Sequence, residues 1–86
     1  MEKFIIIKAE QRGGRAMELS VVGTFDNYAE AKKAFEADFA DQCAEYGVSP
    51  DVAPEDYYEW GAKTATEFEI YDEEGLYAVT EKLVAV

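Results

Sequence analysis

The chain contains no histidine, and among its 86 residues it has one cysteine and two prolines. The absence of histidine removes the commonest metal ligand and the commonest general base. A single cysteine, Cys43, cannot form an internal disulfide, which favours a reducing compartment. An enzyme is therefore the least favoured class, and we expect no catalytic residue, no metal and no cofactor.

Long apolar segments are also missing from the sequence. The longest run, Phe4–Ile7, is far too short to span a bilayer. The first residues lack the basic region, the apolar stretch and the small-residue cleavage site of a signal peptide. These absences predict a cytoplasmic protein that does not associate with membranes.

Apolar and aromatic residues are plentiful, at 49% and 14% of the chain. A disordered chain has too few of either to match this composition, even though the net charge of −11 is high. A length of 86 residues is enough for one small core. The sequence therefore predicts a single folded domain that spans residues 1–86.

Basic residues are almost absent from the last two thirds of the chain. Met1–Lys33 carries five acids and six bases, whereas Ala34–Val86 carries fourteen acids and only Lys63 and Lys82. Such a polyanion binds nucleic acid and anionic membranes poorly, because both require Lys and Arg to neutralise phosphate. The charge favours a basic protein as partner, and proteins with nucleic-acid-binding grooves are the obvious class.

The first third of the sequence has the pattern of a β-hairpin. Lys3–Glu10 is rich in β-branched and aromatic residues, which favour a strand. Gln11–Arg15 contains paired glycines, which suit a tight turn. Ala16–Phe25 returns as a second strand, in which alternate apolar residues share one face: Met17, Leu19 and Val21.

The strongest helix signal follows this hairpin. Asn27 can cap the helix and Glu30 can complete a capping box, while Gly47 provides a stop, so the helix is predicted over Tyr28–Tyr46. At 100° per residue one face of it is apolar. The residues of this stripe are Tyr28, Ala31, Phe35, Phe39, Cys43 and Tyr46. The position of Cys43 on the stripe indicates a buried structural thiol instead of a nucleophile.

A second stripe on the same helix is acidic, and it consists of Asp38, Asp41 and Glu45. Carboxylates three or four residues apart on a helix lie about 5–6 Å from one another, which is close to the phosphate spacing along a nucleic-acid strand. Such a row can occupy a basic groove in place of DNA or RNA. The alternative is an ordinary solvated helix face.

The connection Val48–Thr64 contains a second candidate surface. Within it, Pro54 to Gly61 is predicted to form a single helical turn. Aromatic residues flanked by acids are typical of interface hot spots that accept Arg and Lys. The candidate partner-binding residues are Glu55, Asp56, Tyr57, Tyr58, Glu59 and Trp60. The alternative is that two of the three aromatics fill the core beneath a loop.

A second hairpin ends the sequence. Ala65–Asp72 alternates apolar and polar residues, Glu73–Gly75 suits a three-residue turn, and Leu76–Val86 is the closing strand. The order hairpin, helix, hairpin predicts an α+β fold. We expect one antiparallel sheet of four strands with the main helix packed on one face.

The segment Gly23–Phe39 resembles the strand–helix junction of small proteins from phages and mobile elements of gut bacteria. In size, charge and element order the chain is also similar to acidic anti-CRISPR proteins. Some of those imitate DNA where a CRISPR nuclease reads its recognition motif. This resemblance implies a protein inhibitor without a cofactor that acts inside a bacterial host cell.

The leading hypothesis is therefore an acidic inhibitor that occupies the basic groove of a nucleic-acid-binding enzyme, such as a CRISPR nuclease, in phage counter-defence. The alternative is a non-catalytic accessory or structural domain that pairs through its sheet edge or an apolar surface, for instance as a homodimer.

Overall fold

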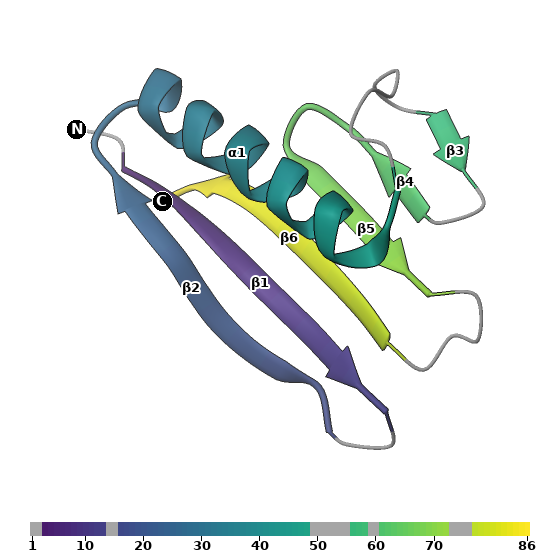
Figure 1. Cartoon of the computed structure of the whole chain (residues 1–86). Helices are drawn as coiled ribbons and strands as arrows, with labels where there is room; N and C mark the ends of the chain where they lie inside the picture. The colour runs from purple at the N-terminus through teal and green to yellow at the C-terminus, as the bar shows by residue number, and fades with distance from the viewer. Residues whose placement is uncertain (1–2, 14–15, 49–55, 59–60, 73–76) are drawn as a thin grey trace.

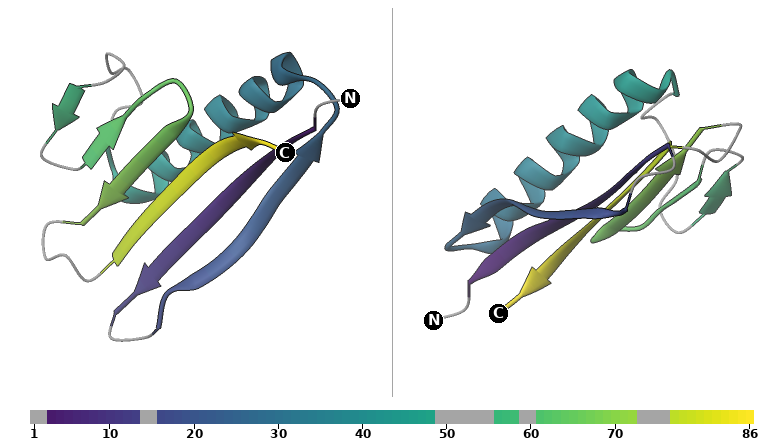
Figure 2. Two further views of the ribbon diagram at one scale, coloured as in Figure 1. Left: turned by 180° about the vertical axis from the view of Figure 1, so that it is seen from behind. Right: turned by 90° about the horizontal axis from the view of Figure 1, so that it is seen from below.

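A computed structural model describes residues 3–13, 16–48, 56–58, 61–72 and 77–86, and for 56–58 it describes the backbone. The fold is α+β, with one helix lying across one face of an antiparallel sheet (Figures 1 and 2). The helix α1 spans Tyr28–Tyr46. The strands are β1 (Phe4–Arg12), β2 (Glu18–Phe25), β3 (Asp56–Tyr58), β4 (Gly61–Lys63), β5 (Glu67–Tyr71) and β6 (Tyr77–Ala85).

The first and last strands lie side by side in the middle of the sheet. The strand order is β2-β1-β6-β5-β4-β3. β1 pairs with β6 over its whole length, from Phe4 opposite Ala85 to Arg12 opposite Tyr77. Beyond these strands, Lys3 and Val86 exchange backbone hydrogen bonds of 3.3 and 2.7 Å. The two hairpins therefore join through the strands most distant in sequence, and Figure 1 shows the start of β1 and the end of β6 at the same corner of the sheet.

Local signals fix both ends of α1, and both predicted ends are confirmed. The side chain of Asn27 accepts a hydrogen bond of 2.8 Å from the N–H of Glu30. Gly47 adopts the left-handed conformation, with φ of 72°, and the Val48 N–H donates to the carbonyl of Cys43 at 2.9 Å. No helix in the described part of the chain combines the length and hydropathy needed to cross a bilayer.

The core lies between α1 and the sheet. The ring of Phe68 on β5 packs against the rings of Phe35 and Phe39 on α1, with centroids 5.5 and 5.0 Å apart. Cys43 is buried as predicted, and burial raises the pKa of its thiol. The other buried apolar residues are Ile6, Ala31, Ile70, Val79 and Leu83.

The expectation of four strands is wrong, because the connection after α1 contributes two more. Asp56–Tyr58 and Gly61–Lys63 form a short hairpin that extends the sheet beyond β5. The expected helical turn is wrong at Asp56–Tyr58, which is extended. Gly61 allows this pairing, since its φ is 146° and an added Cβ would lie 1.7 Å from the carbonyl oxygen of Glu69. Only glycine fits so close to the neighbouring strand.

The alternate apolar residues predicted to share one face of β2 point to solvent and not to the core. Met17, Leu19 and Val21 are 56, 74 and 59% exposed. Leu19 pairs with Ala9 and Val21 pairs with Ile7, positions on the sheet face that α1 leaves open. The helix covers the other face alone, as Figure 2 shows in its edge-on view.

Candidate functional site

A cleft of about 360 Å³ lies where the C-terminal part of α1 passes over the sheet. The last three residues of β1 line it, and Glu10 and Arg12 among them point to the helix-facing side of the strand. α1 contributes residues at helical spacing of three and four. The polar and aromatic lining residues are Glu10, Gln11, Arg12, Gln42, Glu45, Tyr46, Asp72 and Tyr77. Three carboxylates and one guanidinium therefore share one concave surface with two tyrosines.

An internal ion pair forms one wall of the cleft. Nε and Nη2 of Arg12 both donate to Oε2 of Glu10, at 2.9 and 2.6 Å. Nζ of Lys8 lies 3.4 Å from the other oxygen of Glu10. The hydrogen bonds from Arg12 hold the pKa of Glu10 below its usual range. Glu10 is thus ionised and already partnered.

The hydroxyl of Tyr46 lies close enough to the cleft carboxylates for their charges to act on it. Burial raises the pKa of its hydroxyl, and the carboxylates of Glu10, Glu45 and Asp72 raise it further. Asp72 is held in place, because its Oδ1 accepts the N–H of Tyr77 at 3.0 Å. The phenol of Tyr46 is therefore a neutral hydrogen-bonding group surrounded by anions.

The last two turns of α1 present further polar groups. With the amide of Gln42 oriented so that its nitrogen faces Glu45, it donates to Glu45 Oε2 and accepts from Nζ of Lys8, both at 3.2 Å. Asp41 is exposed, and it lies four residues before Glu45 on the same side of the helix. In the described part of the chain no Lys or Arg forms a salt bridge with Asp41, Glu45 or Asp72.

Asp38 faces the sheet. It comes three residues after Phe35 and four before Gln42, both buried, so it sits at the border of the packed face. Opposite it on β6 is Glu81, which is completely buried. Oδ2 of Asp38 and both oxygens of Glu81 are buried without a conventional donor among the described residues. Burial, and then Asp38, raise the pKa of Glu81 to about 9, so a protonated Glu81 donates to Asp38.

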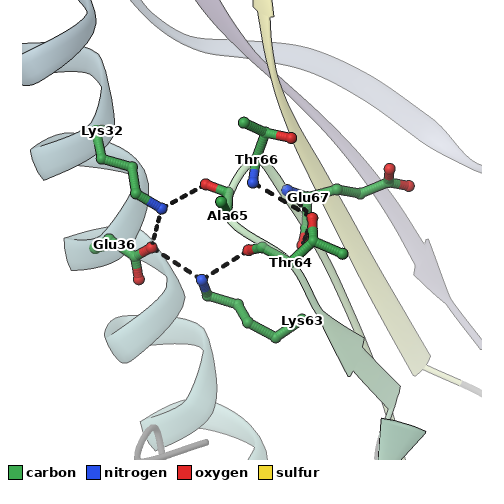
Figure 3. A network of polar contacts seen from close by, with 7 residues as sticks. All are labelled: Lys32, Glu36, Lys63, Thr64, Ala65, Thr66 and Glu67. Carbon is green, nitrogen blue, oxygen red and sulfur yellow. Dashed lines mark hydrogen bonds and ion pairs between the residues drawn. The ribbon is translucent and has the colours of Figure 1, made fainter. Parts of the chain in front are cut away.

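The two bases of the acidic part of the chain are both used within the fold. Nζ of Lys63 is 2.9 Å from Glu36 Oε1 and donates to the carbonyl of Thr64 at 2.9 Å (Figure 3). Its ammonium also lies 5.2 and 5.1 Å from the ring centroids of Phe35 and Phe39. Lys82 lies 3.9 Å from Glu67.

Lys32 completes the network in Figure 3. Its Nζ is 2.5 Å from Glu36 Oε1 and also donates to the carbonyl of Ala65. Burial opposes ionisation of Glu36, but hydrogen bonds from Lys32 and Lys63 outweigh it and lower the pKa of the carboxyl. The network ties α1 to the β4–β5 turn, and it leaves these cations unavailable to the cleft.

The structure therefore brings together only part of the predicted surface. Glu45 lines the cleft. Asp41 is exposed one helical turn before Glu45, and Asp38 is directed to the sheet. Glu55, Glu59 and Trp60 lie outside the described residues. Asp56, Tyr57 and Tyr58 form the backbone of β3, and their side chains also lie outside the description. β3 is three strand positions from β6, which is about 14 Å at ordinary strand spacing.

Of the polar and aromatic residues that line the cleft, only Glu45 is predicted from the sequence as a partner-binding residue. The others are Glu10, Gln11, Arg12, Gln42, Tyr46, Asp72 and Tyr77. Tyr46 belongs to the predicted packing stripe and is half-buried. The signal for Glu10, Arg12 and Tyr77 is the alternation along β1 and β6, which places them on the helix-facing side. That alternation is informative only once β1 and β6 are known to be neighbours.

Carboxylates beside aromatic rings suit an organic cation. A guanidinium can stack on a tyrosine ring and donate to a carboxylate at the same time, as the Arg12–Glu10 pair already does in part. In the described ranges, no three carboxylate or thiol side chains are grouped closely enough to hold a metal ion. The cleft thus offers hydrogen-bond acceptors and two tyrosine rings to a bound group.

Comparison with family descriptions, with curated proteins and with solved structures found no match to this chain. The resemblance to phage and anti-CRISPR proteins remains a prediction from the sequence.

Proposed function

We propose that the chain is a non-enzymatic binding protein that occupies the basic groove of a nucleic-acid-binding enzyme and thereby inhibits it. The observation that carries this proposal is the cleft in which Glu45 and Asp72, neither of which forms a salt bridge among the described residues, lie close to Tyr46. The partner's arginine and lysine side chains, which otherwise bind phosphates, would pair with these carboxylates. A CRISPR nuclease in a phage-infected bacterial cell fits this chemistry.

The placement of the cations supports the same proposal. Lys63 and Lys82 are the only bases after Lys33, and both pair with acids of the same fold. The negative charges of the exposed acids Asp41 and Glu45 are consequently not neutralised by a salt bridge among the described residues. Association with a basic groove would release counterions from that groove, as nucleic acid does.

An affinity capture from bacterial lysate, using three versions of the chain as bait, tests the proposal. We expect the natural chain to retain basic nucleic-acid-binding proteins at low salt and to release them at high salt. Glu45→Lys should weaken retention about tenfold or more, because a charge-assisted contact is worth about 1.5–3 kcal/mol. Glu69→Lys has the same charge change on the exposed side of β5 and serves as the matched control.

A captured protein is then tested for competition. The chain should displace a labelled DNA or RNA duplex from the purified partner, and Glu45→Lys should not. Equal loss of binding in Glu45→Lys and Glu69→Lys would mean that only bulk charge matters. Salt-insensitive capture would contradict the proposal outright.

A further inference from the structure

We propose that two copies of this chain pair through the outer edge of β2, forming one continuous antiparallel sheet across a twofold axis. This inference is independent of the proposed function, because β2 contributes nothing to the cleft. It is carried by the edge of the sheet, by the apolar residues beside that edge and by the charge distribution.

The first observation is that β2 is a long open edge. β2 ends the strand order and pairs with β1, and no other described segment pairs with it. Its eight residues, ELSVVGTF, contain no proline, and their only charge is Glu18. Sheet edges of this length are usually interrupted by proline, shielded by lysine or covered, because unpaired N–H and C=O groups bind other strands. The edge at β3 has only three residues.

The second observation is the exposed apolar surface beside this edge. Leu19 is 74% exposed and Val21 is 59% exposed, while Met17 just before the strand is 56% exposed. Leu19 and Val21 lie on the open sheet face with Ile7 of β1. A twofold axis perpendicular to the sheet keeps both open faces on the same side. The exposed apolar residues Leu19 and Val21 of the two copies would then lie next to each other across the axis and bury part of their surface.

The third observation concerns charge, and it selects a second copy as the occupant. A chain of net charge −11 repels its own copy at most surfaces. The segment 1–33, which contains the β1–β2 hairpin, carries one more base than acids. Pairing at β2 therefore brings the balanced parts of two copies together.

The same geometry keeps the acidic parts apart. Between the β5 strands of the two copies there would be seven strand spacings, or about 33 Å. This exceeds the Debye length of about 8 Å at physiological salt, so the repulsion is largely screened. Glu18 is the first residue of β2. In an antiparallel pair of β2 strands, the Glu18 side chains of the two copies lie at opposite ends of the pair and are therefore far apart.

Sedimentation equilibrium across micromolar to millimolar concentrations tests the pairing. We expect a reversible change from the mass of one chain to twice that mass. The dimer should persist or strengthen at high salt, whereas binding to a basic partner should weaken, so the two proposals fail independently. A single-chain mass at every concentration would overturn this one.

Substitutions locate the interface. Leu19→Lys should give a single-chain mass throughout, because a lysine on the edge opposes pairing, and folding should be unaffected at this exposed position. Tyr71→Lys is the matched control, since Tyr71 is 38% exposed on the same face but lies on β5. It should dimerise normally. Loss of the dimer in Tyr71→Lys would indicate face-to-face stacking and contradict edge pairing, as would a normal dimer in Leu19→Lys.

Amide hydrogen exchange provides a second measurement that does not depend on a variant. Protection of β2 amides should increase with protein concentration, while the amides of β6 in the sheet centre should stay constant. Concentration-independent exchange in β2, under conditions where the mass doubles, would place the contact elsewhere.

Discussion

Glu81 is a carboxylic acid that the fold keeps protonated at neutral pH. The titratable groups that act on it are Asp38 of α1 and Lys8 and Glu10 of β1, and Phe68 of β5 lies opposite it. Burial together with Asp38 favours the protonated form. In the unfolded chain the same group has an ordinary pKa near 4.5. The native state therefore binds one more proton than the unfolded state between about pH 4.5 and pH 9.

The sign of the resulting pH effect follows from this difference. The contribution of Glu81 is fully present below pH 4.5 and is lost as the pH rises towards 9, at up to about 1.4 kcal/mol per pH unit. Urea unfolding at several pH values should show this loss. Glu81→Gln, which can still donate to Asp38, should flatten the profile and be more stable above neutral pH. An unchanged slope in Glu81→Gln would contradict the assignment, and Glu69→Gln is the surface control.

The position of Asp38 could not be predicted from the helix alone. A stripe with Asp41 and Glu45 was the natural interpretation of the spacing, and Asp41 and Glu45 are indeed exposed. Asp38 instead lies at the border of the packed face, and its partner there is Glu81, forty-three positions later in the chain. Cys43 could be assigned correctly, because the apolar stripe to which it belongs is the face of α1 that packs on the sheet.

At the level of elements, the hairpin β3–β4 depends on one glycine. The backbone of Gly61 passes so close to Glu69 that no side chain fits between the two strands. The pairing of Lys63 with Phe68 sets the register and places Lys63 over the phenylalanine rings. The Lys63–Glu36 ion pair therefore depends on the pairing of β4 with β5 at this edge of the sheet.

Gly61→Ala should accordingly release the β3–β4 hairpin from β5, at a cost of about 3 kcal/mol or more. Gly13→Ala is the matched control, because Gly13 also has positive φ, 62°, but an added Cβ there meets nothing within 4 Å. Its cost should be about 1–2 kcal/mol, from backbone strain alone. Faster amide exchange in β4 and β5 should appear only in Gly61→Ala, and equal effects would show that contact with Glu69 is unimportant.

The predictable elements were those with local signals. Asn27 and Gly47 mark the ends of α1, and the glycine pair near Gly13 marks the first turn, so these boundaries follow from a few adjacent residues. The pairing of β1 with β6 and the addition of β4 to β5 are not local. The strand character of Asp56–Tyr58 is a consequence of that addition, which explains why a helical turn was expected instead.

For the whole molecule, the net charge of −11 also affects the free energy of unfolding. Acids crowd into the sequence after Lys33, and the two bases there are already paired, so self-repulsion is concentrated in one part of the fold. Charge segregation could be predicted from the sequence, because it is a property of position along the chain. The cleft that brings two of these carboxylates, Glu45 and Asp72, together with Glu10 could not, since it requires β1, α1 and β6 to be neighbours.

Added salt should therefore raise the free energy of unfolding, because screening relieves more repulsion than it weakens attraction. Urea unfolding in low and high sodium chloride, at fixed neutral pH and low protein concentration, measures this effect. Asp41→Asn/Glu45→Gln removes two exposed charges and should reduce the salt dependence. A fall in stability with salt would show that the ion pairs of Lys32 and Lys63 outweigh the repulsion.

The adjacency of β1 and β6 also sets the order of events during synthesis. β1, β2 and α1 leave the ribosome first, yet the central position beside β1 is filled only when β6 has been translated. Until β5 and β6 have been made, Phe35 and Phe39 lack the ring of Phe68, and Ile6 lacks Leu83 opposite it. Because these contacts join distant parts of the chain, folding should be slow for a protein of this length, and the sheet cannot be completed before β6 has been made. In that interval the apolar residues that β5 and β6 later cover are accessible to any chaperone that binds exposed apolar segments.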